Sequence, residues 1–185
     1  MQEEVEQESD RADGLRVRVA TADDATAIAE LGAAAFTAAF GPANPPGVVE
    51  EYVAEAFAAT TVAAQLADPA SVWLVASDGA GTILGMAHLQ GGDAPPEVAG
   101  HRPIQLSRLY AAAGLTSRGV GSELMGAALA RAADAGHDAM WLGVWEHNPR
   151  AVAFYRRWGF VEVGTVVFRL GDDDQTDLVM ARALR

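Results

Sequence analysis

The chain has 185 residues, half of them hydrophobic and 21% charged, with no cysteine and a formal net charge of −12. This length suits one domain with a real core, and the missing cysteine excludes disulfides, thiolate zinc sites and cysteine nucleophiles. The acidic balance argues against nonspecific DNA binding, which needs clustered Lys and Arg. It would help to attract a cationic substrate, although solubility alone explains it equally well.

The first 13 residues are acidic and polar, and they are predicted to form a disordered leader rather than a signal or transit peptide. Residues 14–185 are predicted to form one domain, because no linker or internal repeat interrupts them. No run of about 18 apolar residues occurs, so no membrane span is expected. With no targeting segment recognised, a cytoplasmic location is expected.

Alternating, β-branched segments predict strands, and capped segments with helical periodicity predict helices. The predicted strands are residues 14–20, 71–77, 82–90, 104–111, 138–144, 160–170 and 177–184. The predicted helices are residues 21–40, 48–57 and 60–67, one that opens at Gly119 and ends before Gly136, and one that runs from Asn148 to Gly159. An acidic loop, Gly171–Thr176, is expected between the last two strands. This order is an α/β pattern around one mixed sheet.

Two glycines, Gly119 and Gly121, open the helix after the strand 104–111. A helix N-terminus presents unpaired N–H groups and a positive dipole, and glycine leaves both open to a phosphate. A structural glycine turn would explain the two residues equally well. The segment matches neither the dinucleotide-binding fingerprint nor the P-loop.

A second motif, "NPRAVAFYRRWGF", begins at Asn148, a helix cap followed by Pro149. Its spacing predicts one buried helical face, made of Ala151, Phe154, Tyr155 and Trp158. Taken alone, Tyr155 would be a core tyrosine whose buried hydroxyl needs a partner.

Together these elements resemble the GCN5-related N-acetyltransferase (GNAT) superfamily: a strand, a glycine-opened helix, a strand, then Asn-x-x-Ala-x-x-Phe-Tyr-x-x-x-Gly-Phe. The resemblance covers nearly all of the chain after the leader. It implies a mostly antiparallel sheet of about seven strands flanked by helices. In this fold strands 104–111 and 138–144 splay apart to hold acetyl-CoA.

The resemblance also assigns residues to the cofactor. Its pyrophosphate would lie on the N–H groups of Thr116, Ser117, Arg118, Gly119, Val120, Gly121 and Ser122. Thr116 departs from the Gln or Arg that the superfamily usually has there, but backbone N–H groups do most of the binding. Backbone groups of Leu109, Tyr110 and Ala111 would pair with the pantetheine arm like an added strand, and Asn148 would contact CoA. Arg118, Arg150 and Arg156 are candidates for CoA phosphates, or simply solvated.

By the same resemblance, Tyr155 is the general acid that protonates the departing CoA thiolate. The general base is less evident, because Gln105 and Ser107 occupy the positions where the superfamily often has a glutamate. Either a water chain leads to another group, or the base lies elsewhere. Glu51, His88 and Glu146 are the candidates, although an ordinary surface or hydrogen-bonding role explains each of them better. The four histidines are scattered, so no metal site is expected.

Segments 34–46, 51–57, 141–148 and 171–184 look like the bacterial PaiA-type polyamine N-acetyltransferases. The predicted acceptor is therefore a small amine such as spermidine or spermine. Glu50, Glu51 and Asp172–Asp174 are candidates to hold a polycation, although a solvated loop better explains the Asp run. In this superfamily the first two helices cover the acceptor groove, and most of their aromatic residues are expected to be core: Phe36, Phe40, Tyr52 and Phe57. A homodimer through the last two strands is expected by analogy. The alternatives are another acceptor (an aminoglycoside, an amino acid or a protein N-terminus) or a non-catalytic acyl-CoA-binding regulatory module.

Overall fold

The computed structural model describes residues 14–45, 47–115 and 119–184. The predicted leader and residues Thr116, Ser117 and Arg118 of the glycine-rich loop lie outside these ranges. Within them, no helix has both the length and the apolar character that a membrane crossing needs.

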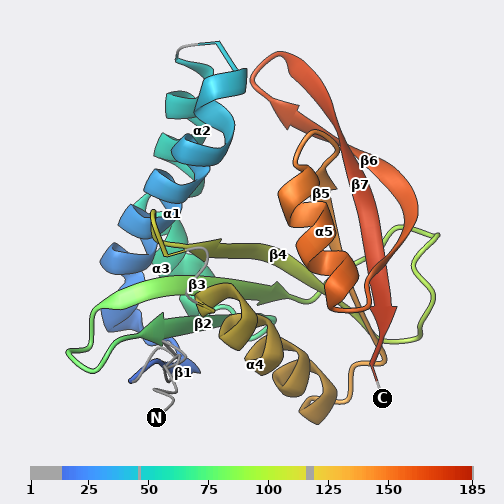
Figure 1. Cartoon of the computed structure of the whole chain (residues 1–185), viewed down its shortest axis with the longest axis horizontal. Coiled ribbons are helices and arrows are strands. Elements are labelled where there is room, and N and C mark those ends of the chain that lie inside the picture. The colour runs from blue at the N-terminus through green and yellow to red at the C-terminus, as the bar shows by residue number, and fades with distance from the viewer. Residues whose placement is uncertain (1–13, 46, 116–118, 185) are drawn as a thin grey trace, which may run out of the picture.

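Seven strands form one sheet in the order β1-β2-β3-β4-β5-β7-β6 (Figure 1). Their bounds are β1 Arg16–Val19, β2 Ser71–Ser77, β3 Ile83–Gln90, β4 Pro103–Ala111, β5 Ala139–Trp145, β6 Val161–Leu170 and β7 Asp173–Ala183. Every neighbouring pair is antiparallel except β4 and β5, which are parallel. The predicted α/β class and the mostly antiparallel seven-stranded sheet are confirmed.

The parallel pair is short, and this opens the sheet. β4 and β5 are in register only from Pro103–Ala139 to Gln105–Trp141. Beyond this point β4 stays paired with β3, and β5 stays paired with β7 as far as Trp145. The two halves of the sheet diverge, as Figure 1 shows. The predicted splay is therefore present, and it exposes one edge of each strand.

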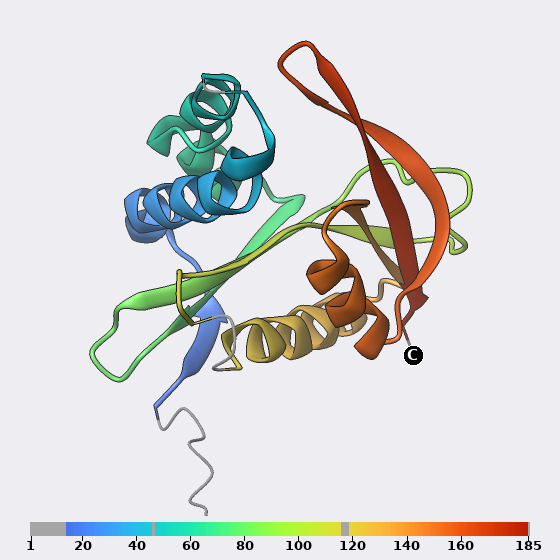
Figure 2. The same ribbon diagram turned by 45° about the horizontal axis from the view of Figure 1, so that its top comes forward.

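Helices cover both faces of the sheet (Figure 2). On one face lie α1 (Ala25–Phe40), α2 (Val48–Ala56) and α3 (Ala59–Ala67), and on the other lie α4 (Val120–Asp134) and α5 (Pro149–Arg157). Short 3-10 turns, Ala22–Asp24 and Gly41–Ala43, precede and follow α1.

Each face has its own core, because successive strand residues point to opposite sides. In β3, Met86 packs toward α1–α3, whereas Ala87 and Leu89 pack toward α4. The α4 side is filled chiefly by Leu106, Leu124, Met125, Met140, Leu142, Phe160 and Met180. The α1–α3 side is filled by Ile28, Phe36, Phe57, Val62 and Trp73.

One expected loop is a strand. Instead of an acidic loop over residues 171–176, only Gly171 and Asp172 turn the chain, and β7 begins at Asp173 opposite Leu170. Gly171 has a φ of +63°, a left-handed conformation that favours glycine. The acidic residues extend the hairpin because backbone pairing holds it, and side-chain propensity is a weak guide for exposed strands.

Candidate active site

The open edge of β4 forms one wall of the gap. The Ala112 N–H donates to the Leu84 carbonyl oxygen on β3 at 2.8 Å. Because backbone groups alternate along a strand, those of Tyr110 also point toward β3, whereas those of Leu109 and Ala111 point into the gap. No described β5 residue pairs with these two positions. Leu109 and Ala111 therefore offer a free strand edge, and Tyr110 contributes its side chain instead.

The glycines at the start of α4 differ in their roles. Gly119 is the N-cap, with a φ of +83°, and a Cβ there would meet nothing within 4 Å. Its carbonyl accepts the N–H groups of Ser122 and Glu123 at 2.9 and 3.0 Å. Gly121 does not have a positive φ, and a Cβ there would touch only the Phe154 ring. The first turn of α4 is thus left open, while buried Val120 anchors it in the core.

The second motif forms α5 as predicted. The Asn148 side-chain oxygen accepts the Ala151 N–H at 3.1 Å, which confirms the cap. The expected buried face is only partly buried, however, because the most enclosed residue is Val152, 6% exposed. The four predicted residues pack beside it against the α4-side core and remain half-buried: Ala151, Phe154, Tyr155 and Trp158.

Tyr155 stands between the Phe154 and Phe160 rings, whose centroids lie 5.5 and 5.9 Å from its own. Burial raises the pKa of its hydroxyl to about 12, and no hydrogen bond to a described residue contributes to that value. The hydroxyl therefore keeps its proton at neutral pH and has that proton to donate.

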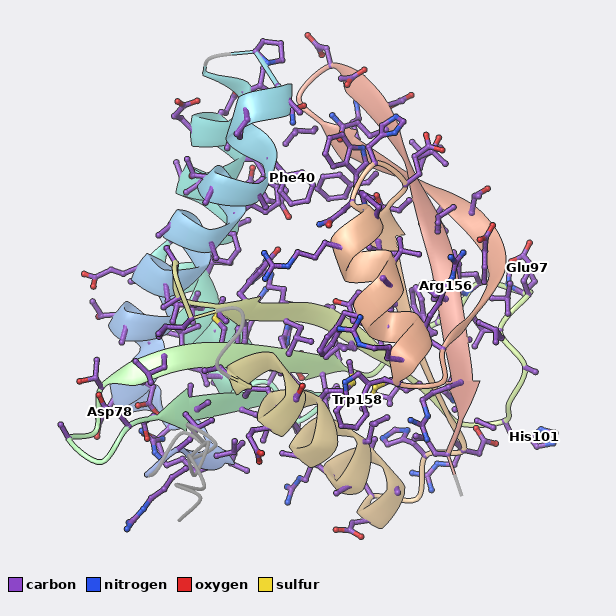
Figure 3. The ribbon with its side chains drawn as sticks, in the orientation of Figure 1. Phe40, Asp78, Glu97, His101, Arg156 and Trp158 are labelled. Atoms are coloured by element: carbon purple, nitrogen blue, oxygen red, sulfur yellow. The ribbon has the colours of Figure 1, made fainter. Side chains whose placement is uncertain are left out.

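Of the three arginines considered for CoA phosphates, Arg118 lies outside the described residues. Arg156 is exposed and lies 3.8 Å from the Glu162 carboxylate (Figure 3). Arg150 is exposed at the start of α5.

The α1–α3 side of the gap carries a cluster of polar groups around Tyr110. Burial raises the pKa of the Tyr110 hydroxyl, Tyr52 raises it further, Arg108 lowers it, and Tyr155 and Asp177 raise it. The four groups that act on the Tyr110 pKa come from α2, β4, α5 and β7.

Asp177 is the site residue that sequence reasoning missed. It pairs with Trp145 of β5 in the β5–β7 ladder. Its Oδ1 is buried and has no hydrogen-bond partner among the described residues. Its Oδ2 is 3.2 Å from where a Cβ on Gly143 would stand. Burial raises the pKa of this carboxyl to about 6. The only sequence signal is a single acid among the apolar residues of a strand.

The residues that the sequence analysis considered for the general base lie in different environments. Gln105 lies in the closed part of the β4–β5 ladder, and Glu146 is exposed, 3.9 Å from His147. His88 is 1% exposed, and both ring nitrogens are engaged by serine hydroxyls: Ser107 on Nδ1 at 2.6 Å and Ser71 on Nε2 at 2.7 Å. Burial, and then the charge of Arg108, lower the pKa of His88 to about 3. His88 is therefore a neutral structural group stacked on Trp73.

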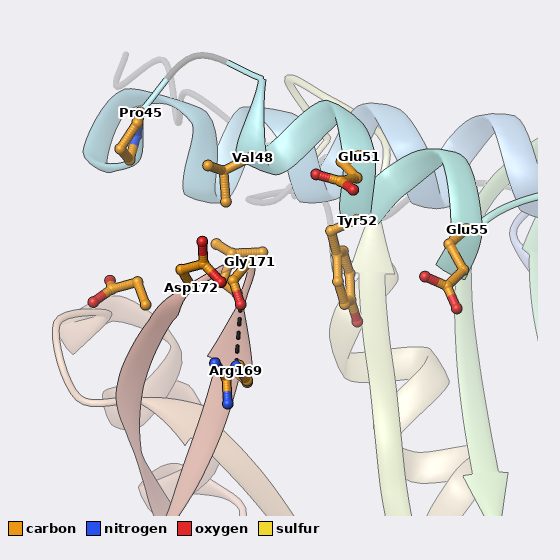
Figure 4. A pocket seen from close by; sticks show the side chains of 10 residues that line it. Pro45, Val48, Glu51, Tyr52, Glu55, Arg169, Gly171 and Asp172 are labelled. Atoms are coloured by element: carbon orange, nitrogen blue, oxygen red, sulfur yellow. Dashed lines mark hydrogen bonds between the residues drawn. The ribbon is translucent and has the colours of Figure 1, made fainter.

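A groove lies at the surface between α2 and the tip of the β6–β7 hairpin, and Tyr52 is the residue that it shares with the groups around Tyr110 (Figure 4). Its charged lining is mostly acidic: Glu51, Glu55, Asp172 and Asp173, with Arg169 as the one cation. Tyr52 lines its inner part and also raises the pKa of Tyr110. Glu50, also expected here, instead accepts the Gly47 N–H at 2.7 Å and caps α2.

Aromatic contacts tie α1 and α2 to the C-terminal strands and close the groove from above. The Phe40 ring, which faces β5 in Figure 3, lies 5.6 Å from Trp145. Tyr52 packs edge-on against Phe168 at 5.6 Å and stacks on Phe36 at 4.5 Å. Among the described residues, no group of three His, Asp or Glu side chains could hold a metal ion.

Comparisons with known proteins agree with this geometry. The model of the acetyltransferase (GNAT) family matches residues 33–160. An uncharacterised N-acetyltransferase of Mycobacterium tuberculosis is 37% identical over 161 residues, which cover 87% of this chain and 98% of that relative.

Two solved structures share the fold. The PaiA N-acetyltransferase of Thermoplasma acidophilum, in complex with coenzyme A, has a TM-score of 0.72 and 17% identity, covering 91% of this chain and 98% of that one. The spermidine/spermine N-acetyltransferase SpeG of Vibrio cholerae has a TM-score of 0.65 and 20% identity, covering 92% and 95%. The splayed strands, the open helix start and the family match lead to one conclusion: this chain belongs to the GNAT family and is an acetyl-CoA-dependent N-acetyltransferase.

Proposed function

We propose that this enzyme acetylates a primary amine of a small polycation, with spermidine and spermine as the first candidates. The observation that supports this is the acidic groove beside α2, which four carboxylates and one guanidinium line. Two proteins of the same fold, PaiA and SpeG, are named as N-acetyltransferases, and SpeG is named for spermidine and spermine. A polycation gains from several carboxylates at once, whereas a single amine does not.

The donor would occupy the α4–α5 side of the gap. The free edge at Leu109 and Ala111 is suited to the amides of the pantetheine arm, and the Ala111 N–H to the thioester oxygen. The N–H groups of Gly119, Val120 and Gly121 are suited to the pyrophosphate, because Gly119 and Gly121 place no side chain over the first turn. The Ser122 N–H, which was also expected there, donates to the Gly119 carbonyl oxygen at 2.9 Å. Thr116, Ser117 and Arg118 would complete this loop.

Two side chains of α5 complete the donor site in this proposal. Asn148 caps the helix and leaves its amide N–H groups for CoA. Tyr155 keeps its proton at neutral pH and would give it to the departing sulfur. A free, protonated phenol at the gap favours an enzyme over a regulatory module that only binds acyl-CoA.

We also propose that the enzyme is a cytoplasmic homodimer, with residues 14–185 as its catalytic domain and 1–13 as a leader. β6 is an edge strand, and it exposes Val161 and Val167 by 61% and 69%. Light scattering on gel-filtered protein tests the dimer, and a single monomeric peak would refute it.

The test of the activity follows CoA thiol release from acetyl-CoA with spermidine, spermine, an aminoglycoside, lysine and a short peptide as separate acceptors. Saturable turnover with the polyamines, at KM values well below those of the other amines, is expected. Turnover with another acceptor alone would refute the polyamine assignment. Acetyl-CoA binding without turnover on any amine would refute the enzyme reading in favour of the regulatory module.

A further inference from the structure

The Asp177 carboxyl of β7 is partly buried and lacks the partners that such a group usually has. One oxygen is buried without a hydrogen-bond partner among the described residues, and the other faces Gly143. A buried carboxylate is costly unless something compensates its charge. No ion pair of the described residues includes it. The carboxyl is therefore placed to receive a cation that the protein itself does not supply.

The space for that cation lies over Gly143. This residue is exposed, although its strand neighbours Leu142 and Val144 are buried. Gly143 lies in the part of β5 that β4 no longer covers. With no side chain on Gly143, the Asp177 carboxyl packs over the exposed Gly143 backbone, and its Oδ2 lies 3.2 Å from where a Cβ would stand.

The two faces of the sheet separate Asp177 from Tyr155. On β7, Leu178 and Met180 pack into the α4–α5 core, whereas Val179 and Ala181 pack on the opposite side. By strand alternation Asp177 points to that opposite side, on which α1–α3 and the acidic groove lie. Tyr155 approaches from α5. Tyr155 and Asp177 therefore belong to opposite faces of the sheet.

We propose that Asp177 is the general base: its carboxylate binds the ammonium group of the acceptor at Gly143 and takes its proton, while Tyr155 serves the sulfur from the other side. This rests on the proposed function, and Asp177 also raises the pKa of Tyr52, which lines the acidic groove.

The reaction balances as follows. The ammonium nitrogen loses one proton to Asp177 and forms a bond to the acetyl carbon through the lone pair so freed. Tyr155 gives its proton to the sulfur as the C–S bond breaks and the sulfur takes the bonding pair. The nitrogen loses a second proton to solvent, which reprotonates Tyr155, and keeps the third as the amide N–H. Asp177 releases its proton to solvent.

The acceptor amine must lose a proton before it can attack the thioester, so the reaction needs a base. An amine with a pKa near 10.4 is neutral in only about one molecule in 2,500 at pH 7. An ordinary carboxylate is a weak base, and burial makes that of Asp177 stronger by raising its pKa to about 6. General bases contribute typically 10²- to 10⁴-fold to a rate.

The test compares Asp177→Asn with the wild type and with Asp134→Asn, a matched loss of one charge on the exposed end of α4. The readout is kcat/KM for spermidine between pH 5 and 10, with acetyl-CoA binding measured by calorimetry. We expect kcat/KM of the wild type to rise with pH and to reach a plateau above pH 6. For Asp177→Asn, kcat/KM at pH 7 should be at least 100-fold lower than for the wild type, while acetyl-CoA binding stays normal. Its kcat/KM should then increase about tenfold per pH unit and approach the wild-type value near pH 10.

That recovery is the decisive result, because a variant that lacks the base can use only amine that is already neutral. A loss that stays constant with pH, or an unchanged kcat/KM, would overturn the assignment. As a second variant, Gly143→Ala should raise KM for the amine and keep the wild-type pH profile, because its Cβ crowds Oδ2 without removing the base.

The outcomes separate the two proposals. If the wild type prefers another amine, the same comparison is made with that amine, and only the polyamine assignment fails. If the wild type is active and Asp177→Asn keeps its pH profile, only the assignment of the base fails. A wild type that acetylates no amine overturns both.

Discussion

Asp177→Asn should make the protein more stable at pH 8 while it removes most of the activity. The raised pKa of Asp177, about 6 against the ordinary 3.8, means that the fold disfavours the ionised carboxyl. Above pH 6 this difference corresponds to about 3 kcal/mol at 1.36 kcal/mol per pKa unit. Solvent screening of the partly exposed side chain reduces it to about 1–2 kcal/mol.

The sign of the pH dependence follows from linkage. The folded protein holds a proton on Asp177 up to about pH 6, whereas the unfolded chain loses it near pH 3.8. The destabilisation caused by the ionised Asp177 carboxyl is therefore absent below pH 3.8. It grows as the pH rises from 4 to 6 and is complete above pH 6. The other titratable groups near Asp177 are present in both proteins and cancel in the comparison: Tyr52, Glu55, Arg108, Tyr110 and Tyr155.

The assay is thermal unfolding of wild type, Asp177→Asn and Asp134→Asn at pH 8 and pH 4.5. For a chain of this size each kcal/mol shifts Tm by about 2–4 °C, so Asp177→Asn should melt about 2–8 °C higher at pH 8. The difference should shrink at pH 4.5, and Asp134→Asn should stay within about 0.5 kcal/mol of wild type. A variant that melts below the wild type at pH 8, or with a gap independent of pH, would refute the reasoning.

Three further predictions concern single residues. Tyr155→Phe should lower kcat at least tenfold with little change in acetyl-CoA affinity, and steady-state kinetics that show an unchanged kcat would remove Tyr155 from the acid role. Gly119→Ala should lower stability by about 1 kcal/mol and raise KM for acetyl-CoA, since its φ of +83° strains any other residue; urea titration and kinetics check both. Asp24→Asn should lower the free energy of unfolding by about 1 kcal/mol at pH 7, because hydrogen bonds from Arg18 lower the Asp24 pKa to about 2. In urea titrations the difference in unfolding free energy between variant and wild type should fade as the pH drops from 4 toward 2. Equal unfolding curves for wild type and Asp24→Asn at pH 7 would contradict this.

Local chemistry made most elements readable in the sequence. Strand β2 has the predicted bounds, Ser71–Ser77, and the Asn148 cap is formed as its residue type indicates. Gly136, at a φ of +78°, ends α4, and Gly119 opens it. Caps, positive-φ glycines and apolar periods act within a few residues, so a single sequence contains the information needed to find them.

The parts that were wrong or missed depend on distant neighbours. The acidic run at Asp173 and Asp174 became strand because Leu170 and Arg169 pair with it. Glu50 belongs to a helix cap rather than to the groove, and Val152 is the best-buried residue of α5.

The sequence by itself determined the order of strands and helices, the caps and the motifs of the donor site, because each arises from residues adjacent in the chain. Only the tertiary structure decided which carboxyl stands in the gap. β7 inserts between β5 and β6, and this brings Asp177 next to Gly143 and near Tyr52, 125 positions earlier in the chain. The burial that raises the Asp177 pKa comes from that packing, and no local pattern encodes it.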